Sequence, residues 1–262
     1  MQKQSFIICA LSLAAGIFGA FIRWLQNVNA FEPETGLQRP GSFWSFAIII
    51  YLAAIALVFL FVVRYLKDNK KLTQPDNFPE AFRGGRILCE VAAIASFALA
   101  GIGGIAMIFE ATAEKVAHFD AINGVFIIIA AICLLIILHS VNTSDRSRGK
   151  AFIFLILALC FRLVTEYKNS ASDPVIWHFA IRILAICAVV VAYYYYAGFC
   201  FGRAKPYKAI YSSFLGIVLS ITSFADGEAS IFYHLATAGF VLGLLTLTLL
   251  LMGNMSQPRH AR

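Results

Sequence analysis

Long apolar blocks, separated by short polar and charged breaks, run along the whole chain. A helix needs about 20 apolar residues to cross a hydrocarbon core about 30 Å thick. Lipid-facing barrel strands alternate in polarity, whereas these blocks do not. The pattern therefore predicts an all-α integral membrane protein, an eight-transmembrane-helix bundle built of four consecutive helical hairpins. We expect the spans at residues 6–25, 43–66, 87–109, 122–142, 151–167, 175–201, 209–224 and 231–253.

The composition agrees with this pattern. Hydrophobic residues make up 60% of the chain and charged residues 13%, and the mean hydropathy is +0.80. Soluble domains contain about 25% charged residues. We expect residues 1–262 to form a single polytopic membrane domain with no soluble domain. The first span resembles a signal peptide, but it continues to Arg23, so we expect it to be retained; cleavage would leave seven spans.

The distribution of Lys and Arg predicts how the bundle is oriented. With both termini cytoplasmic, the cytoplasmic segments hold fourteen of these residues and the outer segments four, including Arg23 as an interfacial anchor. Positive residues concentrate on the cytoplasmic side of membrane proteins. We therefore expect a bacterial-type cytoplasmic (inner) membrane, with anionic lipid headgroups as partners at the cytoplasmic face. The net charge of +7 then reflects insertion, and no nucleic acid partner is expected.

Acidic residues gather on the predicted outer side. Two interpretations stay open, because acidic residues hardly influence topology. They form either a solvated outer surface or an outer vestibule that collects cations or basic solutes. The residues are Glu32, Glu34, Glu110, Glu114, Asp120, Asp173, Asp226 and Glu228.

Small residues recur every four positions in two of the predicted spans. Such stripes allow another helix to pack closely. The first span carries Ser12, Gly16 and Ala20, and the third carries Ser96, Ala100 and Gly104. We expect both stripes to be helix-packing faces and the glycine-rich third helix to lie centrally in the bundle.

The strongest candidate for chemistry is the hairpin over residues 161–183. Arg162 and Glu166 share one helix face and His178 and Arg182 share another, because each pair is spaced i, i+4. Charged residues inside membrane spans are costly and mark functional sites by default. The four residues form either a polar clamp between two helices or a site in which the arginines bind a carboxylate or phosphate.

The two arginines of this hairpin differ in their expected surroundings. Asp173 and Pro174 look like the N-cap and first residue of a helix. Arg182 then leans toward the outer interface and has room to snorkel to the headgroups. Arg162 leans inward, so it needs a partner within the bundle, and Glu166 is one turn away.

Three further features are interpreted from their position alone. Glu90 lies one turn after Arg86, so an ion pair at headgroup level is expected, with proton coupling as the alternative. Loop 67–86 is either a positive-inside connector or a surface for a partner protein. The run Tyr193 to Tyr196 is interpreted as part of an interfacial aromatic belt.

The function classes follow from what the sequence contains and lacks. No P-loop, G-x-S-x-G or H-E-x-x-H motif occurs, so we predict no cofactor and no catalytic residues. We also predict no metal site, because His118, His178 and His234 would have to converge from three hairpins. The leading hypothesis is passage or binding of a small solute, as in a transporter or permease. The alternatives are an enzyme acting on a lipid-linked or amphiphilic substrate, and a non-catalytic sensor or assembly subunit.

Overall fold

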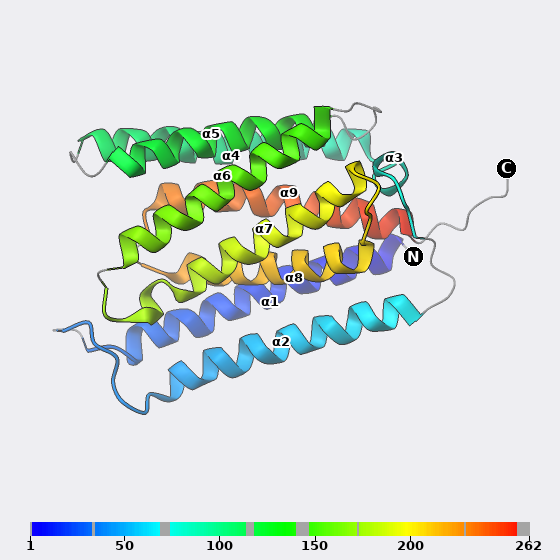
Figure 1. The fold of residues 1–262 in the computed structure, drawn as a ribbon. Coiled ribbons are helices and arrows are strands. Elements are labelled where there is room, and N and C mark those ends of the chain that lie inside the picture. Colours follow the sequence, from blue (N-terminus) through cyan, green and yellow to red (C-terminus); the bar gives the residue numbers. More distant parts are fainter. Residues whose placement is uncertain are drawn as a thin grey trace, which may run out of the picture.

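The computed structural model of the chain describes residues 2–32, 35–68, 74–113, 118–139, 147–171, 173–227 and 229–255. Within these residues the fold is all-α, with no β-sheet, as the apolar blocks predicted. The long helices lie side by side and each runs antiparallel to the one before it in the chain (Figure 1). They are α1 (Gln2–Asn29), α2 (Phe43–Asp68), α4 (Arg86–Ala113), α5 (His118–His139), α6 (Ser147–Ser170), α7 (Ala180–Cys200), α8 (Pro206–Thr222) and α9 (Ile231–Met255).

Among the described residues, seven helices are long and apolar enough to cross a membrane: α1, α2, α4, α5, α7, α8 and α9. The prediction of a multi-pass membrane protein is therefore confirmed. Helix α6 is the one long helix outside this set. Charged side chains interrupt its apolar stretch near both ends and within it, namely Arg148, Lys150, Arg162, Glu166 and Lys168.

Helix α9 forms the centre of the bundle. It packs against α4, α8, α1, α5 and α7. Helix α2, in contrast, packs mainly against α1 and α8. Accordingly, 72% of the apolar segment of α9 is buried, compared with 17% of that of α2. The central helix is thus α9 rather than α4, which packs directly beside it.

Close approach between α4 and α9 depends on glycines. A Cβ atom added at Gly239 of α9 would lie 2.7 Å from the carbonyl oxygen of Ser96 and 2.8 Å from the backbone nitrogen of Ala100. Gly104 approaches α5 instead, where its Cβ would lie 2.9 Å from the carbonyl oxygen of Gly124. At Ser96 and Ala100, the backbone of α4 therefore lies close against α9.

The stripe in α1 faces α8. A Cβ atom added at Gly16 would lie 2.8 Å from the Cβ atom of Ile221. Ser12 is fully buried and its hydroxyl donates to the carbonyl oxygen of Cys9 at 2.7 Å, whereas Ala20 is only half-buried.

The two ends of the bundle differ in content. We call the end that holds residues 2 and 255 the terminal end, and the other, which holds the residue 30–42, 171–179 and 223–230 connections, the distal end (Figure 1). The terminal end also holds the short helix α3 (Phe78–Ala81), inside the 67–86 loop. The distal end holds the short 3₁₀ helices η2 (Ile176–His178) and η3 (Ser223–Ala225).

Part of the 67–86 loop is buried in the bundle. Phe78 and Phe82 are buried, and Phe82 packs its ring against Tyr196 and Phe199. The side-chain amide of Asn254 donates to the carbonyl oxygen of Ala81 at 2.9 Å. This half of the loop closes the terminal end, while residues 69–73 lie outside the described residues.

The tyrosine run near this end is not a uniform aromatic belt. Tyr194 is exposed, but Tyr193 and Tyr196 are fully buried. The Tyr193 hydroxyl donates to the carbonyl oxygen of Phe240 at 2.8 Å, and the Tyr196 hydroxyl lies 2.8 Å from that of Thr248. The interpretation as an interfacial belt is therefore wrong for these two residues, which link α7 to α9.

The start of α7 also differs from the prediction. Asp173 does not cap a helix that begins at Pro174; its Oδ1 atom accepts a hydrogen bond from the backbone N–H of Val175 at 2.8 Å. The chain then forms η2, and α7 begins at Ala180. Arg182 consequently lies in the first turn of α7 rather than eight residues inside it.

Candidate functional site

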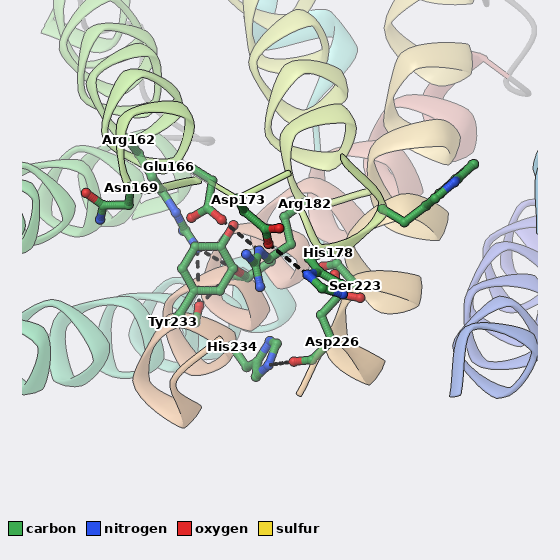
Figure 2. Close-up of polar contacts among 12 residues, drawn as sticks. Arg162, Glu166, Asn169, Asp173, His178, Arg182, Ser223, Asp226, Tyr233 and His234 are labelled. Atoms are coloured by element: carbon green, nitrogen blue, oxygen red, sulfur yellow. Dashed lines mark hydrogen bonds and ion pairs between the residues drawn. The ribbon is translucent and has the colours of Figure 1, made fainter. Parts of the chain in front are cut away.

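A layer of buried and half-buried ionisable side chains lies at the distal end of the bundle (Figure 2). Helix α6 provides Arg162 and Glu166, and α7 provides Arg182. The remaining groups come from the connections and from the first turns of α9. They include Asp173, His178, Asp226, Tyr233 and His234.

Arg162 is held by α9 and not by Glu166. Its side chain is 2% exposed, and its Nη2 atom donates to the hydroxyl of Thr237 at 2.6 Å and to the carbonyl oxygen of Tyr233 at 3.2 Å. The guanidinium carbon lies 4.1 Å from the centre of the Tyr233 ring. A cation over an aromatic face in a desolvated site is stabilised by about 2 kcal/mol. Helix α9 thus provides the partner within the bundle that we expected Arg162 to need.

Glu166 pairs with Arg182 across the hairpin. The Arg182 Nε atom donates to the Glu166 Oε1 atom at 2.7 Å, and both side chains are largely buried. Arg182 is 6% exposed, so the expectation that it snorkels to the outer headgroups is wrong. Its Nη1 atom is buried and has no hydrogen-bond partner among the described residues.

His178 belongs to the connection before α7 and pairs with Asp173. The His178 Nδ1 atom lies 2.7 Å from the Asp173 Oδ2 atom. Burial raises the pKa of the Asp173 carboxyl, but the Val175 N–H, His178 and Arg182 lower it more, so that pKa lies below its ordinary value. Asp173 is therefore an anion at neutral pH, and it fixes the course of the connection.

Arg23 is a member of this layer that sequence reasoning missed. It is 1% exposed and donates to the Asp226 carboxylate at 2.6 Å, to the Gln26 side chain at 2.7 Å and to the carbonyl oxygen of Trp177 at 2.6 Å. The interpretation of Arg23 as an interfacial anchor is therefore wrong; the exposed neighbour Trp24 is the residue at the surface. The available signal was the i, i+3 spacing of Arg23 and Gln26, which places two polar side chains on one helix face.

A cavity of about 340 Å³ opens beside this layer, between α4, α5, α6, α7 and α9. Its lining includes, among other polar residues, five ionisable side chains and a buried amide. They are Glu110, Asp120, Glu166, Asp173 and Arg182, together with Asn123. The sequence identified Glu166 and Arg182 as a possible site and counted three of the acids in an outer vestibule, but it gave no sign of Asn123.

Asn123 is a cavity residue with an unsatisfied polar atom. It is 3% exposed, and its side-chain oxygen makes no hydrogen bond to any residue that the structure describes. Asp120, one turn before it on α5, accepts a hydrogen bond from the Asn169 amide at 2.7 Å. Leaving a buried polar group without a partner costs about 1–3 kcal/mol. The Asn123 amide is therefore available to whatever fills the cavity.

A larger cavity of about 620 Å³ lies at the terminal end, lined mainly by aromatic and aliphatic side chains together with Arg148 and Lys150. The described residues that line it include no acidic side chain. We therefore base the candidate site on the distal cavity, which brings charges of both signs together.

The other predicted residues lie apart from the distal cavity or do not assemble a site. Glu90 is at the terminal end, where the Nε atom of exposed Arg86 donates to it at 2.8 Å. The His234 Nε2 atom lies 3.3 Å from the carbonyl oxygen of Asp226, and the side chain of His118 lies outside the described residues. In the described part of the chain, no three His, Cys, Asp or Glu side chains converge as metal ligands would.

The four residues of the 161–183 hairpin thus divide between two roles. Glu166 and Arg182 form a cross-helix pair that lines the cavity, whereas Arg162 and His178 are bonded to other parts of the layer. The geometry alone carries the functional interpretation. Comparisons of the chain with models of protein families, with curated protein sequences and with solved structures found no match.

Proposed function

We propose that the protein binds a small polar solute in the distal cavity and passes it across the cytoplasmic membrane. The distal end faces outward in this proposal, and both termini are cytoplasmic. The excess of Lys and Arg in the segments at the terminal end supports this orientation. A gradient or a partner supplies the energy, because the chain carries no nucleotide-binding motif.

The proposal includes α6 as an eighth membrane span. Helix α6 packs between α5 and α7, and at 24 residues it is long enough to cross a hydrocarbon core. Its two central charges are paired inside the bundle, Arg162 with α9 and Glu166 with Arg182. Ionisable residues are tolerated in membrane spans when they face the bundle interior and have such partners.

The observation that carries the proposal is that two residues lining the cavity each have a buried polar atom without a hydrogen-bond partner among the described residues. These atoms are the side-chain oxygen of Asn123 and the Nη1 atom of Arg182. Apolar packing would have been the less costly way to fill this space. A solute that bonds to both groups would recover their desolvation cost. The cavity volume lies at the small end of the range of about 300–1,000 Å³ for ligand sites.

The charge around the cavity supports recruitment of solutes from the outside. Glu110, Asp120 and Asp173 add three carboxylates to the Glu166–Arg182 pair. Because carboxylates outnumber the one cation among the described lining residues, the lining has a net negative charge, and such a cleft concentrates counter-ions and raises association rates. This charge supports the outer vestibule over the solvated surface, the two alternatives that the sequence left open.

Uptake by proteoliposomes tests the proposal. We expect radiolabelled uptake above that of protein-free liposomes for at least one of four probes: glucose, alanine, choline and succinate. Substitution Asn123→Leu keeps the side-chain size and removes both polar atoms, so we expect uptake to fall at least tenfold.

The matched control is Asn29→Leu, because Asn29 is exposed at the distal end of α1. It should transport at the wild-type rate. The proposal is contradicted if none of the four probes enters faster than in protein-free liposomes, or if folded Asn123→Leu protein transports as well as the wild type.

A further inference from the structure

The lining of the distal cavity contains both a guanidinium and carboxylates, and this combination restricts the class of solute. Arg182 offers an N–H from α7, and Glu110 and Asp120 offer carboxylates from α4 and α5. We propose that the solute is a small zwitterion, with a carboxylate that binds Arg182 and an ammonium that binds Glu110 and Asp120. The inference rests on the proposed function, because it assigns the ligand of the same cavity.

Arg182 provides a directed hydrogen-bond donor. Glu166 occupies its Nε atom at 2.7 Å, which leaves the buried Nη1 atom without a partner among the described residues. A guanidinium is planar and always charged, and it presents donors that match a carboxylate. The neighbouring cation, Arg162, also has a buried Nε atom without a described partner, but it donates to Thr237, stacks on Tyr233 and is not among the residues that line the cavity. Arg182 is thus the cationic group of the cavity with a donor to spare.

Glu110 and Asp120 provide the anionic groups. Within the described residues, the half-buried Glu110 carboxylate forms no ion pair, and Asp120 accepts a single hydrogen bond, from Asn169. Two carboxylates offer about eight lone-pair positions, so most of them are available. The nearby ammonium of Lys168 lies over the Phe119 ring, 3.4 Å from its centre, and is not paired with either carboxylate among the described residues. The two carboxylates can therefore accept hydrogen bonds from the ammonium group of a solute.

Asn123 can bond to either end of a zwitterion. It lies one turn after Asp120 on the same face of α5, and it is nearly fully buried. An amide both donates and accepts hydrogen bonds, so it suits a position between opposite charges.

Solutes with a single charge fit the cavity less well. A simple cation would leave the Arg182 Nη1 atom buried without an acceptor. A simple anion would approach Arg182 through a cavity that also holds Glu110, Asp120 and Asp173. Like-charge contacts in a site of low dielectric are strongly unfavourable. Only a zwitterion compensates both charges.

Calorimetric titration of the purified protein tests this assignment with three related probes. Ethylamine is alanine without its carboxylate, and propionate is alanine without its ammonium. We expect the Kd for alanine to be at least tenfold lower than that for either analogue. Arg182→Lys keeps the positive charge and removes the spare nitrogen, so alanine should then bind no better than ethylamine. Glu110→Gln should raise the Kd of alanine and ethylamine at least tenfold each.

The matched controls are Arg64→Lys and Glu80→Gln, because both side chains are exposed and lie at the terminal end. Neither should change any of the three Kd values. If Arg182→Lys does not fold, the three titrations of wild-type protein and those of Glu110→Gln still test the zwitterion assignment.

The outcomes separate the solute class from the binding function. Ethylamine or propionate binding as tightly as alanine would overturn the zwitterion assignment and leave the cavity as a binding site. Uptake of glucose, choline or succinate without calorimetric binding of alanine would also overturn it. Failure of every probe in both the uptake and titration experiments would remove the proposed function itself.

Discussion

Substitution Gly239→Ala is expected to destabilise the protein by about 2 to 3 kcal/mol, near the upper end of the usual range for overpacking. The added Cβ atom would lie 2.7 Å from the carbonyl oxygen of Ser96 and 2.8 Å from the backbone nitrogen of Ala100. Both are backbone atoms of α4, so no side-chain rotation relieves the contact. Helix α4 would have to move away from the central helix along its whole interface.

The control for this variant is Gly101→Ala on α4. A Cβ atom there has no described atom within 4 Å, and alanine has the higher helix propensity, so this variant should be as stable as the wild type or more so. Thermal unfolding in detergent measures both. Equal melting temperatures for the two variants would show that α4 and α9 are not in backbone contact.

Substitution Arg23→Met is expected to cost about 3–5 kcal/mol of folding free energy, the usual loss when one partner of a buried ion pair is removed. The Asp226 carboxylate would stay buried without this cation. The Gln26 side chain and the carbonyl oxygen of Trp177 would also lose their donors. The stability of Arg23→Lys should lie between those of the wild type and Arg23→Met, because one ammonium cannot reproduce three directed hydrogen bonds.

Denaturant unfolding of the purified protein measures this series, with Arg39→Met as the control. Arg39 is exposed on the connection after α1, so its loss should change the stability by less than about 0.5 kcal/mol. An Arg23→Met protein within that same margin of the wild type would contradict the buried network.

The helices were predictable because the lipid requirement acts on each segment separately. Every predicted span overlaps a long helix, and most boundaries agree within a few residues. The boundary that affects the site is the start of α7, which was predicted at residue 175 and lies at Ala180 in the structure. There the Asp173 side chain bonds to Val175 in a turn, a local alternative to capping that the sequence permits equally.

The partners in the site were not predictable, because they come from distant parts of the chain. Arg162 lies one turn from Glu166, yet it bonds to Thr237, and Glu166 bonds to Arg182. Arg23 and Asp226 are 203 residues apart. Helical spacing identifies which side chains share a face, but only the packing of α1, α6 and α9 decides which faces meet.

Burial was equally hard to infer for residues at the ends of spans. Arg23 and Tyr196 occupy positions where arginine and tyrosine often anchor a helix at the interface. Both are buried, because η3 packs on α1 and α3 packs on α7, and these short helices lie in connections that the apolar pattern does not place. Asn123 gave no signal at all, since a single amide in an apolar span resembles an ordinary packed position.

The most direct measurement of the central claim is a crystal structure of the protein grown with a saturating concentration of alanine. The account predicts density for one molecule in the distal cavity, with its carboxylate within hydrogen-bonding distance of the Arg182 Nη1 atom and its ammonium beside Glu110. A cavity that contains only water molecules bonded to Asn123 and Arg182, at a concentration at which alanine is taken up, would contradict it.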